Sequence, residues 1–165
     1  MEGKDMGILE AIEAAMKAET EAKNFYLGAV EKASSAQGKD MLKQLAAFEE
    51  SHFKALEKLK GSLADSGAFI IYGGTKFTPV PSGLPSTSAK AAETNLDDVL
   101  DVLNLAISAE TKAAQTYKDL AEMTSDPNGK EMFQKLAEEE TLHRRILSDE
   151  FYQLTNMGGE WAWGE

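Results

Sequence analysis

The sequence predicts an all-α protein, a four-helix bundle made of two repeated helical hairpins joined by one long crossover. Apolar residues recur at helical spacing through four segments, and none of these segments contains an internal proline. Residues 9–57 align with residues 100–148 without a gap, with 17 identities in 49 positions. The 165 residues fall within the usual size of one domain, so we expect a single domain over residues 1–165.

The first hairpin is predicted from helices over residues 8–33 and 39–63. The turn Ser34–Gly38 separates them, and Ser35 can cap the second helix. Apolar side chains follow one side of each helix. In the first helix these are Ile8, Ile12, Ala15, Ala22 and Tyr26, and in the second Leu42, Leu45, Phe48, Leu56 and Leu59.

The second hairpin is predicted from helices over residues 96–123 and 128–154. Asp126 followed by Pro127 is typical of an N-cap with proline at the first helical position. Because this half repeats the first without a gap, we expect one hairpin used twice.

A crossover over residues 61–95 joins the hairpins and collects Gly, Pro, Ser and Thr. A connection of this length is explained if it runs the length of a bundle. Its Phe69–Tyr72 run is too short for a helix, and we expect it to cover the bundle surface or to pair with another copy. The tail 155–165 carries Trp161 and Trp163, which we expect to dock on the bundle or on a second subunit.

Composition excludes several function classes. A formal net charge of −11 argues against a nucleic-acid partner, which needs a basic face. The absence of cysteine excludes disulfides, thiolate metal sites and cysteine nucleophiles. The sequence shows neither a signal peptide nor a membrane-length apolar run, so we expect a cytoplasmic protein without a membrane partner.

The chain has two histidines, and each follows a glutamate by three residues, as Glu49-x-x-His52 and Glu140-x-x-His143. Residues three apart share one face of a helix, so each pair can reach one metal ion. A further glutamate, Glu19 or Glu110, precedes each pair by 30 residues. One such motif is a weak indication, whereas two in the same register of a repeat are a strong one.

The spacing around each turn indicates that all these side chains lie at one level. Glu19 lies 15 residues before Ser34, and Glu49 lies 11 residues after Gly38. With a rise of about 1.5 Å per residue, the helical stretches from the turn to the two glutamates are similar in length. Both carboxylates therefore lie at nearly the same level along the bundle axis. The second hairpin has the same spacing, and the four helices thus gather four glutamates and two histidines.

The donor types favour a pair of hard or borderline metal ions. Carboxylates and imidazoles without thiolate suit iron or manganese, or a mixed pair, and disfavour a closed structural zinc site. Six side chains exceed what one ion needs. Two cations held close together would repel less if carboxylates bridged them, and we assign that role to Glu49 and Glu140.

Four short motifs carry a family resemblance. Residues 18–26 and Glu49–His52 resemble the first-helix and second-helix motifs of rubrerythrins, and Ser108–Glu110 and Glu139–His143 are similar to the third and fourth. The resemblance covers both hairpins but neither the crossover nor the tail.

The resemblance implies membership of the rubrerythrin and ferritin-like family, whose fold is a ferritin-like four-helix bundle. It implies a centre of two iron ions that reacts with peroxide or oxygen, with Glu19 and Glu110 as terminal ligands and one histidine for each iron. Two departures stand out. The sequence contains no cysteine, and so lacks the rubredoxin domain of rubrerythrins, which implies an external electron donor such as a rubredoxin-like protein. It also has Ala113 where rubrerythrins have an additional glutamate.

Four residues near the ligands have competing interpretations. Tyr26 and Tyr117 each follow a terminal glutamate by seven residues. They either hydrogen-bond the ligand carboxylates or pack only in the core. Glu50 and Glu139 flank the ligands, and we predict that they lie on the surface. We also expect burial and mutual repulsion to raise the pKa values of all four ligand carboxylates in the metal-free protein.

The predicted function is that of a di-iron oxidoreductase that oxidises ferrous iron with peroxide or oxygen. A non-catalytic iron-binding or iron-handling protein is the first alternative, and a structural helical-hairpin protein without metal is the second. The apolar residues of the crossover and the tail would be difficult for a monomer to cover, so we expect a small oligomer, a homodimer, rather than a hollow cage.

Overall fold

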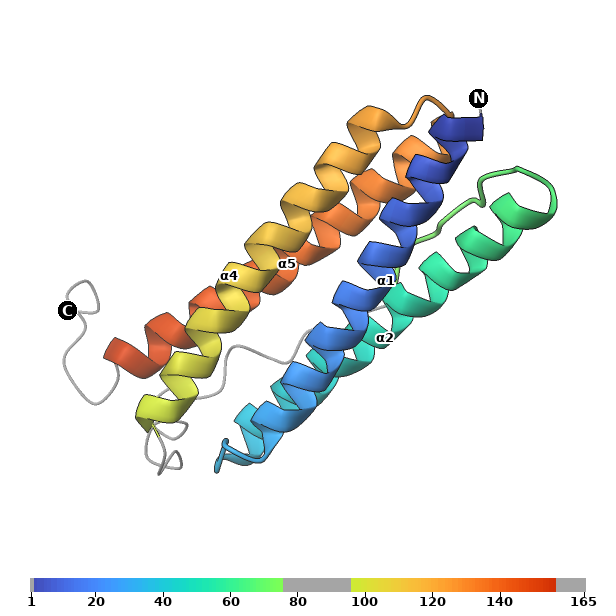
Figure 1. Ribbon diagram of the computed structural model, residues 1–165. Coiled ribbons are helices and arrows are strands. Elements are labelled where there is room, and N and C mark those ends of the chain that lie inside the picture. The colour runs from blue at the N-terminus through green and yellow to red at the C-terminus, as the bar shows by residue number, and fades with distance from the viewer. Residues whose placement is uncertain (1, 76–95, 157–165) are drawn as a thin grey trace.

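The computed structural model describes residues 2–75 and 96–156, which form four helices and, within these ranges, no strand. The helices are α1 (Glu2–Val30), α2 (Ala36–Asp65), α4 (Leu96–Met123) and α5 (Pro127–Asn156). Figure 1 shows α1 lying along α2 and α4 along α5, as two hairpins side by side. The predicted all-α four-helix bundle is confirmed. None of the four helices has an apolar stretch that could span a bilayer.

The helix bounds follow the local caps, and they lie within a turn of the predicted ranges except at the start of α1. Ser35 accepts a hydrogen bond from Gly38 N at 2.9 Å and so begins α2 at Ala36. Asp126 accepts hydrogen bonds from the first backbone amides of α5 in the same way. Gly67, with φ of 74°, lies just beyond the end of α2, where a left-handed residue closes the last turn.

Each hairpin is closed by the same lysine contact. Lys39 Nζ donates to Val30 O at 2.9 Å in the first hairpin. Lys130 Nζ donates to Ala121 O at 2.9 Å in the second. A cation at the C-terminal end of a helix satisfies carbonyls that have no partner in the helix. The repeat seen in the sequence is therefore also a repeat of contacts.

Two apolar clusters fill the interior, one toward each end of the bundle. One contains Leu45, Leu103 and Leu147, and the other contains Leu56 and Leu136, all at most 1% exposed. The contacts between the two hairpins are far fewer than those within each hairpin. A layer of polar side chains lies between the two clusters, and this layer is where the predicted ligands are found.

The chain after α2 turns back along the bundle and packs on α5. Tyr72 is buried in this segment, and its carbonyl accepts a hydrogen bond from Lys135 Nζ at 3.1 Å. Phe69 lies so close to Gly129 that a Cβ added there would fall 2.5 Å from the ring. This part of the crossover covers the bundle surface, which was one of its two predicted roles. The remaining crossover, residues 76–95, and the tail with Trp161 and Trp163 lie outside the described residues.

Candidate metal centre

The six predicted ligands lie together in the middle of the bundle and come from all four helices. Glu19 comes from α1, Glu49 and His52 from α2, Glu110 from α4, and Glu140 and His143 from α5. All six are buried, and the most exposed of them is Glu19, at 3%. Burying four carboxylates is costly unless they are paired or bind a cation.

The ligand atoms form two overlapping groups of four. Within each group the atoms lie within 4.8 Å of one another. One group is Glu19, Glu49, His52 and Glu140, and the other is Glu49, Glu110, Glu140 and His143. Glu49 and Glu140 belong to both groups, which fits the bridging role that we assigned to them from the sequence. Each group has the donors to hold one metal ion.

Each histidine turns its Nδ1 toward three carboxylates. The oxygens nearest to His52 Nδ1 belong to Glu140 at 3.0 Å, Glu19 at 3.4 Å and Glu49 at 3.6 Å. Those nearest to His143 Nδ1 belong to Glu49 at 3.0 Å, Glu110 at 3.5 Å and Glu140 at 3.6 Å. The two rings stack with an interplanar angle of 12° and centroids 5.8 Å apart. The two halves of the centre are therefore related by a pseudo-two-fold axis.

Two tyrosines bind the outer glutamates across the hairpin boundary. Tyr26 of α1 donates to Glu110 at 2.5 Å, and Tyr117 of α4 donates to Glu19 at 2.6 Å. Both tyrosines are almost fully buried. Of the two interpretations of these tyrosines, the structure shows the hydrogen bonds to the ligand carboxylates. Each hairpin holds the terminal glutamate of the other.

Several buried atoms of the centre have no hydrogen-bond partner among the described residues. They are Glu19 Oε2, Glu49 Oε2, His52 Nδ1, Glu110 Oε2 and Glu140 Oε1. Unpaired buried polar atoms are rare in folded proteins because each loses its hydration without compensation. A cation bound to these oxygen and imidazole donors would satisfy them. The donor set therefore fits iron or manganese.

The titration behaviour is less uniform than the sequence led us to expect. Burial and the charge of Glu49 raise the pKa of Glu19 to about 8, and they raise that of Glu140 well above its usual range. Burial also favours neutral Glu49 and Glu110, but close contacts outweigh it and lower both pKa values. For Glu49 these contacts are with Glu19 and then His143, and for Glu110 the main contact is with His143. The expectation of four raised values was wrong, because it left the histidines out.

Both histidines hold their protons unusually firmly. Burial favours the neutral ring, but contacts with the carboxylates outweigh it. They raise the pKa of His143 to about 9 and that of His52 well above its usual range. Without a bound metal, the centre therefore balances its carboxylates with protons on both imidazoles and on Glu19 and Glu140. A bound cation would have to displace these protons.

Glu139 was predicted to lie on the surface, and that prediction is wrong. Its side chain is 15% exposed, and its Oε1 lies 2.9 Å from His52 Nε2. Glu139 reaches this position because Tyr72 of the returning segment packs beside it. The aligned repeat offered a sign of this contact, since Glu139 pairs with Phe48, an apolar residue. Glu50, also predicted on the surface, is 32% exposed and pairs with Lys23 at 2.8 Å.

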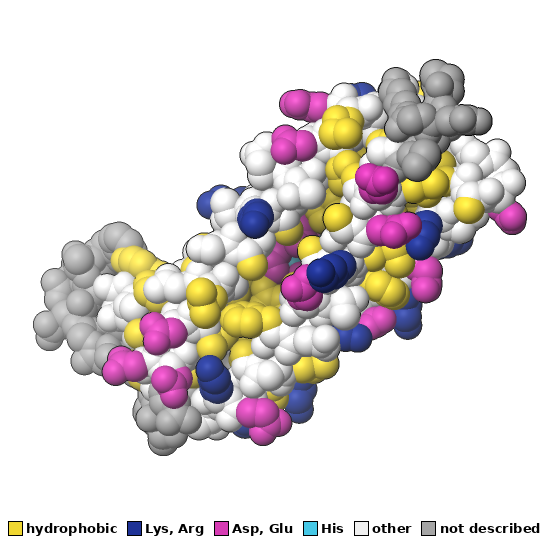
Figure 2. All heavy atoms as spheres, viewed as in Figure 1, with side chains coloured by type: hydrophobic (Ala, Val, Ile, Leu, Met, Phe, Trp, Pro, Cys, Tyr) yellow, Lys and Arg dark blue, Asp and Glu magenta, His cyan; other side chains and the backbone are white. Residues whose placement is uncertain are grey.

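A cleft between α1 and α4 reaches the centre from outside. It encloses about 870 Å³, and Glu19, Glu49, Glu110 and Glu140 lie along it. Figure 2 shows it as a hollow in this face, with acidic side chains at its base. Its walls are mostly small and apolar, formed by Ala11, Ala14, Ala15, Ala18, Ala22, Ala106, Ala109 and Ala113 among others.

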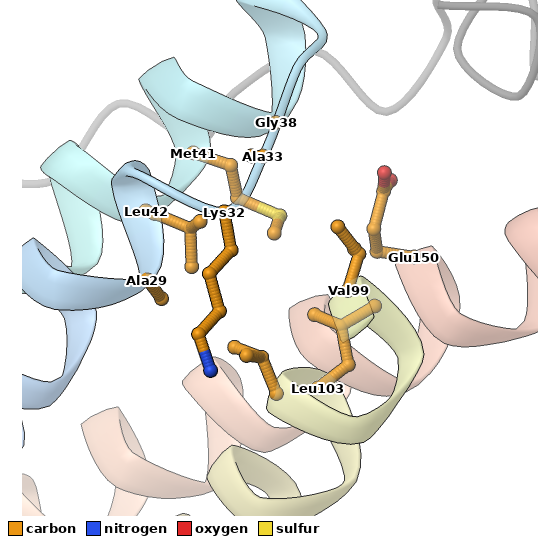
Figure 3. Close-up of a pocket in the computed structure, with 10 residues that line it drawn as sticks. Ala29, Lys32, Ala33, Gly38, Met41, Leu42, Val99, Leu103 and Glu150 are labelled. Atoms are coloured by element: carbon orange, nitrogen blue, oxygen red, sulfur yellow. The ribbon is translucent and has the colours of Figure 1, made fainter. Parts of the chain in front are cut away.

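A second, much smaller cavity lies near the turn of the first hairpin (Figure 3). It encloses about 10 Å³ and is lined mainly by apolar residues such as Met41, Val99 and Leu103. That volume holds at most about one water molecule. None of the six ligands lines it, so the cleft between α1 and α4 is the candidate route to the centre.

Comparison with known proteins agrees with the geometry. The Rubrerythrin family model matches residues 87–157, which include Glu110, Glu140 and His143. This confirms the family resemblance for the second hairpin, while the motifs of the first hairpin lie outside the matched residues. A solved structure of a hypothetical protein from Pyrococcus furiosus is 27% identical, with a TM-score of 0.71, over 93% of this chain and 93% of that one. No curated protein matches this chain.

Proposed function

We propose that this chain, whose second hairpin matches the Rubrerythrin family model, is a di-iron carboxylate oxidoreductase. It would oxidise ferrous iron with peroxide or oxygen, and an external electron donor would then return the iron to the ferrous state. The observation that carries the proposal is the pair of overlapping buried ligand groups that share Glu49 and Glu140. Two groups with two shared carboxylates are what a pair of adjacent cations requires.

Each ion would have its own histidine and its own outer glutamate. His52 and Glu19 would hold one ion, His143 and Glu110 the other, and Glu49 and Glu140 both. Iron bound there would supply the one-electron redox chemistry that protein side chains lack. The protein supplies position, because Tyr26 and Tyr117 fix the outer glutamates by hydrogen bonds from the opposite hairpin.

The same side chains also bind protons and release them. Glu19, with its pKa raised to about 8, carries a proton at neutral pH in the metal-free protein. Metal binding needs the deprotonated carboxylate, so loading must release that proton. The cleft gives a route for the proton and for a small oxidant. Ala22 and Ala113 each follow an outer glutamate by three residues, and both line the cleft without filling it.

Metal analysis together with turnover tests the proposal. The purified protein should bind about two iron ions per chain when loaded anaerobically. Stopped-flow mixing with peroxide, and separately with oxygen, should show repeated turnover while a reductant is supplied. Iron binding with only a single oxidation would favour the iron-handling alternative, and failure to bind any metal would favour the structural one. The variant Glu49→Ala with Glu140→Ala is the control and should lose both binding and turnover.

We also propose the partners that this function requires. An external rubredoxin-like protein is the expected electron donor, by resemblance to the family. A homodimer would cover large apolar side chains that are exposed on the single chain, among them Ile71 at 79% and Met123 at 57%. The expected compartment is the cytoplasm. Light scattering tests the dimer, and a monomer or a particle of many chains would contradict it.

A further inference from the structure

The two histidines occupy matching places in the repeat, but their outer ring nitrogens have different neighbours. His52 Nε2 lies 2.9 Å from a carboxylate oxygen of Glu139. The residue of the first hairpin that aligns with Glu139 is Phe48, and its ring packs edge-on against His143 with centroids 4.1 Å apart. Glu139 therefore acts on one histidine of the pair and makes no contact of this kind with the other.

Glu139 is held firmly in this position by the chain segment that follows α2. The hydroxyl of Tyr72 lies 3.1 Å from both carboxylate oxygens of Glu139, and Thr75 N donates to one of them at 3.4 Å. Tyr72 and Thr75 also share a hydrogen bond of 2.8 Å. Lys135 Nζ fixes the backbone of Tyr72 from α5. A carboxylate with this many donors has little freedom to rotate away.

The position matters because a histidine that binds metal must offer a nitrogen without a proton. Neutral imidazole carries a single N–H, and a neighbouring acceptor determines which nitrogen has it. A carboxylate at Nε2 keeps the proton there. The lone pair of His52 is then on Nδ1, which faces Glu19, Glu49 and Glu140. Such a partner also increases the basicity of the ligand.

We propose that Glu139 is a positioning residue that orients His52 for metal binding, so that the ion on the His52 side depends on it and the ion on the His143 side does not. The two metal positions are then inequivalent, although their ligands repeat. This inference rests on the proposed function, because it presupposes that two ions bind. Glu139 itself is absent from both ligand groups and acts only through His52.

Titration of the metal-free protein with cobalt(II) tests the inference, because its absorption and heat of binding report each ion. Glu139→Leu keeps the volume but removes the acceptor, and it should weaken one of two binding steps by about 10- to 100-fold. Glu139→Gln keeps a neutral acceptor and should have a smaller effect. Glu138→Gln removes the same charge from an exposed neighbour and should bind both ions as the wild type does.

The tautomer can be read directly in the protein loaded with diamagnetic zinc(II). The chain has two histidines, so their ring N–H signals are few and assignable by ¹⁵N NMR. His52 should show a slowly exchanging Nε2–H in the wild type, and Glu139→Leu should lose it. The His143 signals should be unchanged. Melting curves of all variants show which of them remain folded.

Three outcomes separate the two proposals. If the wild type binds two ions and Glu139→Leu weakens the binding of one ion, the proposed function and the role of Glu139 are both supported. If the wild type binds two ions and Glu139→Leu weakens both equally, or neither, the role of Glu139 is wrong while the proposed function survives. If the wild type binds no metal, both proposals fail together.

Discussion

The two hairpins agree in what they point into the centre and differ in what surrounds it. Their outer glutamates, inner glutamates and histidines match one for one, as do the tyrosines and the closing lysines. The residues that surround the ligands do not match, since Phe48 of the first hairpin aligns with Glu139 of the second. Within residues 2–75 and 96–156, the returning segment with Tyr72 packs on the second hairpin. Repetition thus determines the geometry of the ligands and leaves their neighbours free to differ.

The largest expected effect separates shared from unshared ligands. Glu49→Ala or Glu140→Ala should lose nearly all bound metal, because each carboxylate belongs to both ligand groups. Glu19→Ala or Glu110→Ala should lose about one ion of two, since each belongs to a single group. Metal per chain after desalting is the measurement. Equal losses at all four positions would rule out the bridging assignment, and Glu50→Ala is the matched control.

The metal-free protein should become less stable as pH rises from about 5 to 9. The pKa of Glu19 rises to about 8 and that of His143 to about 9 in the folded state, and both Glu140 and His52 shift upward as well. A raised pKa means that the folded state binds more protons than the unfolded chain. The stability that these groups contribute is therefore fully present below their pKa values in the unfolded chain. It is lost as the pH rises through their pKa values in the folded state.

Melting temperature against pH measures this loss, which should amount to several degrees. Glu19→Gln with Glu140→Gln, the pair with raised pKa values, should flatten the curve. Glu49→Gln with Glu110→Gln should also flatten it, because these two carboxylates help to raise the pKa values of Glu140 and His143. Glu138→Gln, in an exposed residue outside the centre, is the control and should keep the wild-type slope. Ferrous iron should reverse the slope, since it binds deprotonated ligands of the folded form alone. An unchanged slope in the first double variant would contradict the assignment.

The tyrosines test how symmetric the two halves are. Tyr26→Phe and Tyr117→Phe each remove one hydrogen bond to a buried glutamate. We expect each to cost about 1.5–3 kcal/mol, the usual range for a bond to a charged group. Denaturant unfolding of the loaded protein measures both. Closely similar costs would support the pseudo-two-fold relation, whereas a large difference would show that the asymmetry extends to the outer glutamates.

The smallest expected effect concerns the segment that packs on the second hairpin. Gly129→Ala would bring a Cβ to 2.5 Å from the Phe69 ring, and overpacking of this kind costs about 1–3 kcal/mol. Gly61→Ala in the first hairpin meets nothing within 4 Å and should stabilise α2 by about 0.5–1 kcal/mol. Thermal unfolding compares the two. A neutral Gly129→Ala would mean that Phe69 moves aside freely.

The sequence was sufficient for the helices and for the gathering of the six ligands because both depend on spacing along helices. The repeat determined which residues lie at the same height. The contact between Glu139 and His52 could not be predicted, because it depends on the path of residues 67–75 across α5. The lowered pKa values of Glu49 and Glu110 escaped prediction for a related reason. They depend on histidine–carboxylate distances of 3.0 and 3.5 Å, and helical spacing does not determine distances that finely.

The difference between Phe48 and Glu139 also bears on why both hairpins belong to one chain. A dimer of identical single hairpins could present the same six ligands, but its symmetry would place the same residue beside both histidines. When the two hairpins belong to one chain, each has its own part of the sequence. A substitution in one hairpin then leaves the other unchanged. The covalent link thus allows the surroundings of the two ligand groups to differ, as Phe48 and Glu139 do beside the two histidines.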